Sequence, residues 1–180
     1  MPTALPRIDR PIVLVGLMGV GKSTVGKRLA RRLGLEFVDS DEEIERAADH
    51  SIAEIFDRFG ENSFRDGERR VIARLIDGPP RVIATGGGAF INDETRTLIL
   101  KRGIVIWLDA DVETLAERVS RRDHRPLLRN KEPLPLLQDL AGVRNPVYAE
   151  AHLHIRSQPA PHERAVDEIV KALAKWEPET

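Results

Sequence analysis

The stretch Gly-Leu-Met-Gly-Val-Gly-Lys-Ser-Thr at positions 16–24 constrains the fold of this chain more than any other feature. It fits the pattern G-x-x-x-x-G-K-[ST], which needs a buried strand before it and a helix after it. Both are predicted here, because residues 11–15 form a continuous apolar run and residues 22–33 carry apolar side chains at helical spacing. In this arrangement successive backbone N–H groups point at one place, beside the positive end of the helix dipole. The pattern therefore predicts a phosphate-binding loop and a nucleoside triphosphate ligand.

Two side chains of this loop have expected roles of their own. Lys22 would reach the β- and γ-phosphates, and the hydroxyl of Ser23 would ligate Mg²⁺. The glycines let the backbone close around an anion, since no Cβ stands in the way. A glycine-rich turn without function is the alternative interpretation, but it does not account for the strand and the helix on either side.

The composition is that of a single ordinary domain. With 180 residues the chain is long enough to bury a core of its own, and we expect one domain over residues 1–180. Cysteine is absent, which excludes disulfides and thiolate metal sites, and no apolar run approaches the roughly 18 residues of a membrane span. The first residues lack a secretory signal, so we expect a cytoplasmic protein with no membrane partner. The net charge of −1 gives no overall field that would favour a nucleic acid.

Segments rich in apolar and β-branched residues alternate along the chain with segments of helical spacing. This alternation predicts an α/β fold, in which a parallel sheet carries helices on both faces. The expected strands are residues 11–15, 36–38, 81–85, 103–108 and 152–156. The expected helices are residues 22–33, 61–76, 93–101, 111–122 and 163–175.

Two intervals are too long for simple connections. Residues 41–60 contain two short helical patterns, the second with Ser51 as its N-cap. Residues 118–147 are rich in arginine and proline and are typical of a mobile lid more than of a core element. Because ligands bind outside the carboxyl ends of parallel strands, we expect such insertions to lie beside the substrate.

Two carboxylates follow the second expected strand. Asp39 and Asp41 are two residues apart in extended chain, so their side chains share one side and can face one cleft. One could hold Mg²⁺ through water, while the other accepts a proton from a substrate hydroxyl. Alternatively, Asp39 or Ser40 caps the helix that begins near Asp41, and capping does not exclude the other roles.

Three successive glycines, Gly86, Gly87 and Gly88, follow the third expected strand. They could let a ligand approach the backbone closely and offer it N–H donors, or they could form an ordinary flexible turn. A GTPase should also carry an Asn-Lys-x-Asp segment that reads the base. The nearest sequence, Asn-Lys-Glu-Pro at positions 130–133, lacks the aspartate, so the motifs favour a kinase.

Taken in order along the chain, these motifs resemble the shikimate kinase family. Six of them occur in the family's order: positions 16–24, Phe-Val-Asp-Ser-Asp at 37–41, Phe-Arg at 64–65, Ala-Thr-Gly-Gly-Gly at 84–88, Arg-Pro-Leu-Leu at 125–128 and Arg-Asn-Pro-Val-Tyr at 144–148. The family implies a P-loop kinase with a five-stranded parallel sheet, a substrate-binding subdomain at about residues 40–70 and a lid at about residues 118–135. Its members transfer the γ-phosphoryl group of ATP to the 3-hydroxyl of shikimate.

The resemblance also implies roles for single residues. The residues that would hold shikimate are Asp41 at its hydroxyls, Arg65 and Arg144 at its carboxylate, and the backbone of Gly86, Gly87 and Gly88. The residues that would contact ATP are Gly19, Val20, Gly21, Lys22, Ser23, Thr24 and Arg125. Mg²⁺ would be bound by Ser23 and, through water, by Asp39, and the catalytic residues would be Lys22, Asp41 and Arg125.

Several details stay open at this point. Asp41 could be a base or could only orient the hydroxyl. Either Glu61 or Glu68 could fix the rotamer of Arg65, since both lie within one helical turn of it. Arg118 is the best second phosphate contact, and Tyr148 is expected to pack. No residue after the last strand is assigned to the adenine, because the register there is uncertain.

Two other functions compete with this interpretation. One is a kinase for another sugar acid, such as a gluconate kinase, which would also need an arginine clamp. The other is a kinase-like binding module that has lost catalysis; it should lack Lys22, Asp41 or one clamp arginine, and all are present. The expected partners are ATP and a small-molecule substrate, with no nucleic acid or membrane, and we expect a monomer.

Overall fold

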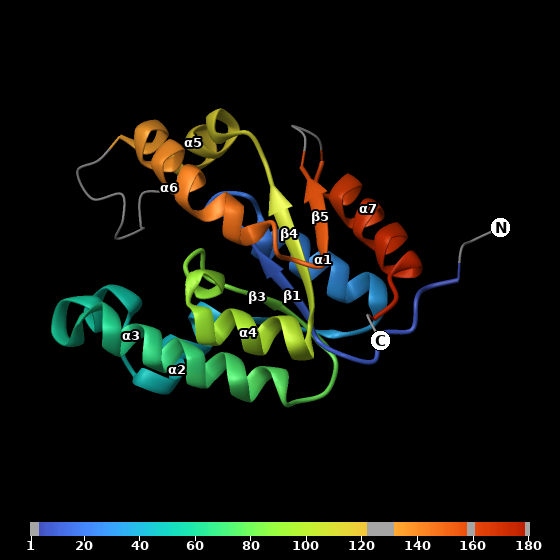
Figure 1. Cartoon of the computed structure of the whole chain (residues 1–180), viewed down its shortest axis with the longest axis horizontal. Helices are drawn as coiled ribbons and strands as arrows, with labels where there is room; N and C mark the ends of the chain where they lie inside the picture. The colour runs from blue at the N-terminus through green and yellow to red at the C-terminus, as the bar shows by residue number, and fades with distance from the viewer. Residues whose placement is uncertain (1–3, 122–131, 158–160, 179–180) are drawn as a thin grey trace.

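The core of the molecule is a sheet of five parallel strands. The computed structural model describes residues 4–121, 132–157 and 161–178. The strands, in their order across the sheet, are β2 (Glu36–Asp39), β3 (Arg81–Ala84), β1 (Ile12–Val15), β4 (Ile104–Asp109) and β5 (Leu153–Arg156). All neighbouring pairs are parallel. The fully buried β1 lies in the middle (Figure 1), as its unbroken apolar run predicts. The α/β prediction with a five-stranded parallel sheet is confirmed.

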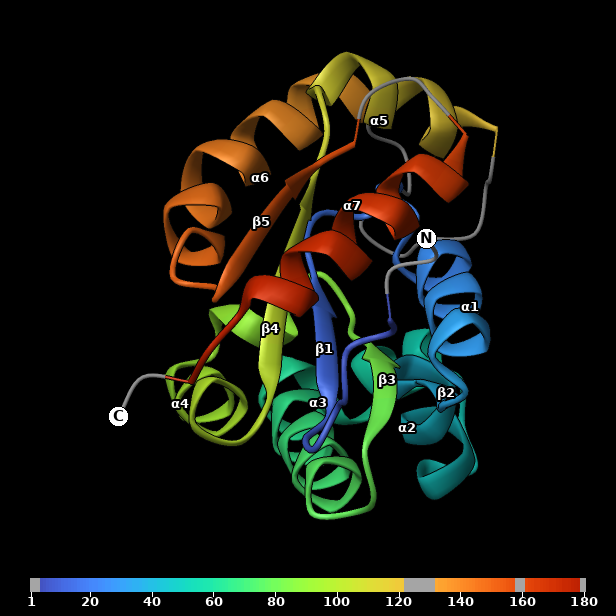
Figure 2. The ribbon, with the colours of Figure 1, turned by 90° about the vertical axis from the view of Figure 1, so that its right-hand side faces the viewer.

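Helices cover both faces of this sheet. On one face lie α1 (Lys22–Leu33) and α7 (His162–Lys175), which pack against each other (Figure 2). On the other face lie α3 (Ile52–Ile76) and α4 (Asp93–Arg102). The short 3-10 helix η1 (Ala89–Ile91) lies between β3 and α4 in the chain. The buried side chains form one continuous core between these layers. Their burial is the main favourable term in folding.

The segment after β2 begins with two capped helices. Helix α2 (Ser40–Ala48) is capped by Asp39, and α3 is capped by the hydroxyl of Ser51, which accepts a hydrogen bond from the Glu54 amide at 3.1 Å. The expected helix at 61–76 is longer than predicted, because it continues the second short pattern of residues 41–60 into one helix. A break remains at Gly60, whose φ of 83° favours glycine.

One prediction for the second insertion is wrong. Residues 133–148 contribute to the core, because they form α6 (Pro133–Tyr148), a helix that packs against α5 (Val112–Ser120) and buries Leu137 and Tyr148 completely. The proline content is misleading here, since a proline in the first helical turn gives up an N–H that has no partner there anyway. Residues 122–131 of the expected lid lie outside the described residues.

No helix in the described ranges is both long enough and apolar enough to cross a membrane.

Candidate active site

The phosphate-binding loop connects β1 to α1 at the carboxyl edge of the sheet. The chain turns through positive φ at Gly19 and at Gly21, which with its φ of 96° directly precedes α1. The ammonium group of Lys22 donates hydrogen bonds to the carbonyl oxygens of Gly16 at 2.6 Å and Leu17 at 3.1 Å. The lysine is therefore folded against the loop and is 9% exposed. A cation and a helix N-terminus thus meet at one point, which is what a polyphosphate requires.

Side chains and backbone around this loop differ in what they can offer a nucleotide. Val20 is buried in the core, so only its backbone is available. The guanidinium of Arg118 donates a hydrogen bond to the carbonyl oxygen of Gly19 at 3.3 Å, so it lies next to the loop. The sequence did not predict that His162, the first residue of α7, lies beside this loop. A Cβ at Gly21 would come within 3.0 Å of its ring.

The predicted catalytic residue Arg125 lies outside the described residues.

Asp39 caps α2, as one of the two alternatives predicts, and it also contacts the phosphate-binding loop. One carboxylate oxygen accepts a hydrogen bond from the Ser23 hydroxyl at 2.7 Å, and the other caps α2 by accepting from the Asp41 amide at 2.9 Å. Ser23 and Asp39 therefore place two hard oxygen donors together beside the loop, and such donors suit Mg²⁺. Within the described residues no group of three or more His, Asp or Glu side chains could hold a metal ion. A magnesium ion here would take its remaining ligands from water and phosphate.

The triple-glycine run is the point where three side chains from three elements converge. A Cβ at Gly86 would lie 2.8 Å from a carboxylate oxygen of Asp41, and one at Gly87 would lie 3.0 Å from Nη1 of Arg144. A Cβ at Gly88 would overlap the guanidinium of Arg65.

None of these three glycines has a positive φ, so glycine is needed here for space rather than for backbone freedom. The structure thus brings Asp41 of α2, Arg65 of α3 and Arg144 of α6 to one loop. An ordinary flexible turn would not require this.

Arg65 forms a close ion pair with Glu68 and a longer one with Glu61. Its Nη1 donates to Oε1 of Glu68 at 2.7 Å, whereas its Nε lies 3.8 Å from the exposed Glu61 carboxylate. Glu68 is 1% exposed, and burial raises the pKa of its carboxyl group to about 7 even though the charge of Arg65 opposes this shift. Arg65 is therefore held by a carboxyl group whose pKa lies close to neutral pH.

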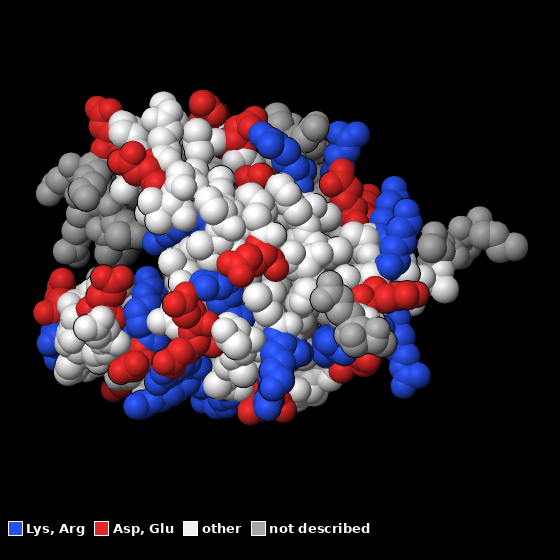
Figure 3. Space-filling view, in the orientation of Figure 1, with Lys and Arg blue, Asp and Glu red and all other residues white. Residues whose placement is uncertain are grey.

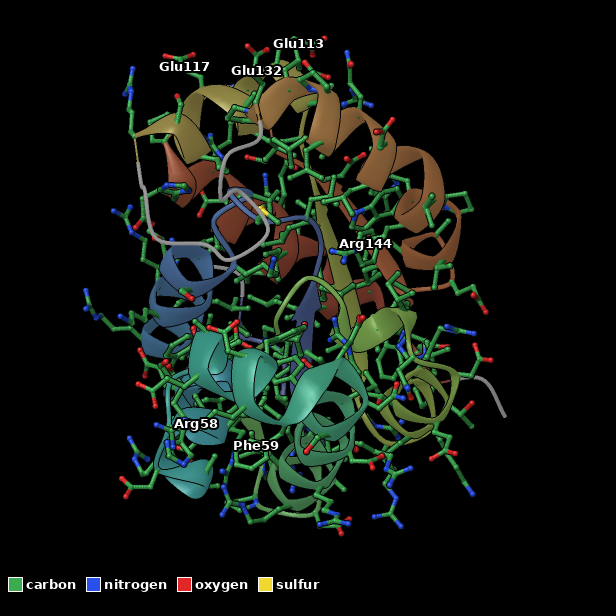
Figure 4. The ribbon with its side chains drawn as sticks, turned by 90° about the vertical axis from the view of Figure 1, so that its left-hand side faces the viewer. Arg58, Phe59, Glu113, Glu117, Glu132 and Arg144 are labelled. Carbon is green, nitrogen blue, oxygen red and sulfur yellow. The ribbon has the colours of Figure 1, made fainter. Side chains whose placement is uncertain are left out.

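Arg144 reaches from α6 toward the glycine loop. Figure 4 shows it on the inner side of α6, whereas Arg58 and Phe59 lie on α3 across from it. One helical turn later, the hydroxyl of Tyr148 donates a hydrogen bond to the carbonyl oxygen of Gly87. Sequence reasoning treated Tyr148 as a packing residue only. Its spacing of four residues from Arg144, on one helix face, was the signal for a second role.

Charge alone does not mark this site. Acidic and basic side chains are intermixed over the face of the molecule in Figure 3, with no single extended basic field. The site arginines are distinguished by position, because both converge on one loop beside a phosphate-binding turn.

The fold and the site together define a class of protein. A parallel sheet with a phosphate-binding loop after its central strand, and a charged site at the same edge, is the arrangement of a P-loop kinase that acts on a small molecule.

Comparison with known proteins identifies the family. The family model for shikimate kinase matches residues 18–174. A shikimate kinase from Caulobacter vibrioides is 60% identical over 168 residues, which cover 93% of this chain and 84% of the relative. The solved structure of a shikimate kinase from Acinetobacter baumannii, in complex with shikimate, matches with a TM-score of 0.87 at 40% identity, covering 94% of this chain and 93% of that one. The chain belongs to the shikimate kinase family.

A gluconokinase from Sinorhizobium meliloti also matches, with a TM-score of 0.63 at 21% identity over 94% of each chain. At that identity the likeness shows a shared fold alone.

Proposed function

We propose that this chain transfers the γ-phosphoryl group of ATP to the 3-hydroxyl of shikimate. The observation that carries the proposal is the meeting of Asp41, Arg65 and Arg144 at the triple-glycine loop, in a chain of the shikimate kinase family. That loop is next to the phosphate-binding turn, since a Cβ at Gly87 would lie 3.7 Å from the Gly16 carbonyl oxygen. Acceptor and nucleotide sites are thus adjacent, as direct transfer requires.

The acceptor has one carboxylate and three ring hydroxyls, and the site offers a group for each kind. We assign Arg65 and Arg144 to the carboxylate, because a planar guanidinium can donate two parallel hydrogen bonds to it. We assign Asp41 to the hydroxyls, because an ionised carboxylate can only accept hydrogen bonds and hydroxyls donate them. Gly86, Gly87 and Gly88 would let the ring lie close to the backbone.

The nucleotide side supplies positive charge where the phosphates lie. The backbone of Gly19, Val20 and Gly21 would surround the phosphates together with the first turn of α1, which includes Ser23 and Thr24. Mg²⁺ would be held by the Ser23 hydroxyl and, through water, by Asp39, and when bound it offsets charge on the phosphates. Lys22 would exchange its contacts with the loop carbonyls for phosphate oxygens, and Arg125 would add a second cation.

Phosphoryl transfer then depends on alignment of the hydroxyl with the γ-phosphate more than on covalent catalysis by the protein. The 3-hydroxyl oxygen forms a bond to the γ-phosphorus as the bond to the β,γ-bridging oxygen breaks, and ADP leaves with that electron pair. The transition state is loose, with charge on the oxygens in flight, so Lys22 and Arg125 stabilise it electrostatically. Asp41 would orient the hydroxyl and could accept the proton that the hydroxyl loses.

ADP release with MgATP and each of shikimate, quinate and gluconate tests the proposal. We expect turnover that depends on shikimate and on Mg²⁺. Turnover of gluconate without shikimate turnover would show that the acceptor is another sugar acid. Nucleotide binding with no turnover of any acceptor would indicate a binding module. We further propose a cytoplasmic monomer, and size-exclusion chromatography with light scattering tests the oligomeric state.

A further inference from the structure

Tyr148, the last residue of α6, is the only tyrosine of the chain and is completely buried. Its ring packs between Phe90, at a centroid distance of 6.4 Å, and Trp107, at 6.0 Å. A phenylalanine would satisfy this apolar setting equally well. A buried hydroxyl costs free energy unless it is hydrogen-bonded, so its partners indicate what it does.

The hydroxyl lies between two groups of the substrate site. It donates its hydrogen to the carbonyl oxygen of Gly87. The guanidinium of Arg144 lies beside the same residue, because a Cβ at Gly87 would come within 3.0 Å of Nη1 of Arg144 and within 3.8 Å of the Tyr148 hydroxyl. A guanidinium can only donate hydrogen bonds, and the phenolic oxygen keeps lone pairs that can accept them. Arg144, the Tyr148 hydroxyl and the Gly87 carbonyl therefore lie together as one polar chain beside the glycine loop.

This chain fixes two parts of the site at once. Because a peptide unit is planar, holding the Gly87 carbonyl also fixes the direction of the Gly88 N–H, which belongs to the same unit. Gly88 in turn lies against the guanidinium of Arg65. At its other end the chain reaches Arg144, whose guanidinium has five N–H donors and so keeps donors for a ligand. An arginine held in one rotamer loses less conformational entropy when a ligand binds.

We infer that Tyr148 is a positioning residue, whose hydroxyl orients Arg144 and the Gly87–Gly88 peptide for binding of the acceptor's carboxylate. The inference rests on the proposed function, since it concerns the same acceptor site. Tyr148 does not touch the reacting atoms, so it acts on binding of the acceptor and not on the phosphoryl transfer itself.

Tyr148→Phe tests the role, because it removes one oxygen and keeps the packing with Phe90 and Trp107. We expect KM for shikimate, and Kd from calorimetry, to rise about tenfold, the scale of one hydrogen bond to a charged group. KM for ATP and kcat should stay within about twofold. The control is Ile99→Val in α4, a buried substitution away from the site that costs a similar amount of stability. It should leave both KM values unchanged.

A double-mutant cycle separates positioning from general loosening. If Tyr148 acts through Arg144, Tyr148→Phe should raise KM for shikimate far less in an Arg144→Lys background than in the wild-type protein. An equal rise in both backgrounds would overturn the inference, and so would equal rises for Tyr148→Phe and Ile99→Val. If the wild-type protein turns over shikimate and Tyr148→Phe has the same KM, the positioning role is wrong while the proposed function stands. If the wild-type protein does not turn over shikimate, the proposed function itself fails.

Discussion

The ion pair between Arg65 and Glu68 satisfies only one of the two carboxylate oxygens of the buried Glu68. Oε1 of Glu68 accepts from Nη1 of Arg65 at 2.7 Å, whereas Oε2 is buried and has no hydrogen-bond partner among the residues that the structure describes. Burial therefore outweighs the favourable charge of Arg65 and raises the pKa of Glu68 from 4.5 to about 7. The carboxyl group that holds Arg65 therefore changes charge near neutral pH.

The raised pKa of Glu68 predicts a pH dependence of the free energy of unfolding, which Glu68→Gln should reduce. Between pH 4.5 and about 7 the folded state holds the Glu68 proton and the unfolded state does not, so the free energy of unfolding falls as pH rises through this window. The loss is at most about 3.5 kcal/mol, from roughly 1.4 kcal/mol per pKa unit. Urea denaturation at about pH 5 and about pH 7.5 measures it.

Glutamine does not titrate, so the difference between the two pH values should shrink in Glu68→Gln. Glu61→Gln is the control, since that carboxylate is 68% exposed and should leave the pH dependence as it is. An unchanged pH dependence in Glu68→Gln would show that other groups cause it.

Gly88→Ala should weaken acceptor binding without preventing folding. The backbone at Gly88 has φ −93° and ψ −8°, which alanine adopts easily, but the added Cβ would overlap the guanidinium of Arg65. Displacing Arg65 should raise KM for shikimate by about 10-fold or more, the scale of a lost charged hydrogen bond. Gly142→Ala, in the exposed middle of α6 with no atom within 4 Å of the new Cβ, should leave KM unchanged. A normal KM in Gly88→Ala would separate Arg65 from the acceptor.

Arg65→Lys and Arg144→Lys should each raise KM for shikimate far more than KM for ATP. Lysine keeps the charge but loses the planar fork, so the expected loss is about 1.5–3 kcal/mol of binding free energy. Arg69→Lys, on α3 one turn from Arg65 and paired with Glu94, is the matched control. Equal effects on both substrates would mean that the two arginines act in folding or in nucleotide binding.

Lys22→Ala should abolish turnover. The lysine compensates charge that grows on the phosphates during transfer, so kcat should fall along with kcat/KM, by about 10²- to 10³-fold or more. Lys27→Ala, an exposed lysine on the same helix, should behave like the wild-type protein. A wild-type kcat in Lys22→Ala would mean that the loop binds an anion without supporting chemistry.

Asp41→Asn distinguishes a base from an orienting group. Asparagine is nearly isosteric and can still bond a hydroxyl, but it cannot accept a proton at neutral pH. If Asp41 is the base, kcat should fall about 10²- to 10⁴-fold while shikimate binding weakens only moderately. If Asp41 only orients the hydroxyl, the fall should be nearer about 10-fold, with binding affected as much. The exposed neighbour Glu42→Gln is the control, and wild-type kcat and affinity in Asp41→Asn would remove Asp41 from the site.

Short-range sequence patterns predicted most of the helices and strands. They failed for α6, whose formation depends on tertiary packing. The strands and their helices follow from short-range periodicity, which is why β1 and α1 fall within a residue of their expected bounds. Helix α6 was missed because arginine and proline content resembles a loop, whereas its stability comes from burying Leu137 and Tyr148 against the rest of the core.

The sequence by itself determined the phosphate-binding loop, the α/β class and the family, since these depend on residue types at fixed short spacings. Only the tertiary structure decided that Glu68, and not Glu61, pairs closely with Arg65, because both lie one helical turn away and burial selects between them. It alone decided that the Tyr148 hydroxyl reaches Gly87, 61 positions away in the chain. Spacing along the chain specifies which groups can meet across one helical turn, but contacts between distant segments depend on how the elements pack.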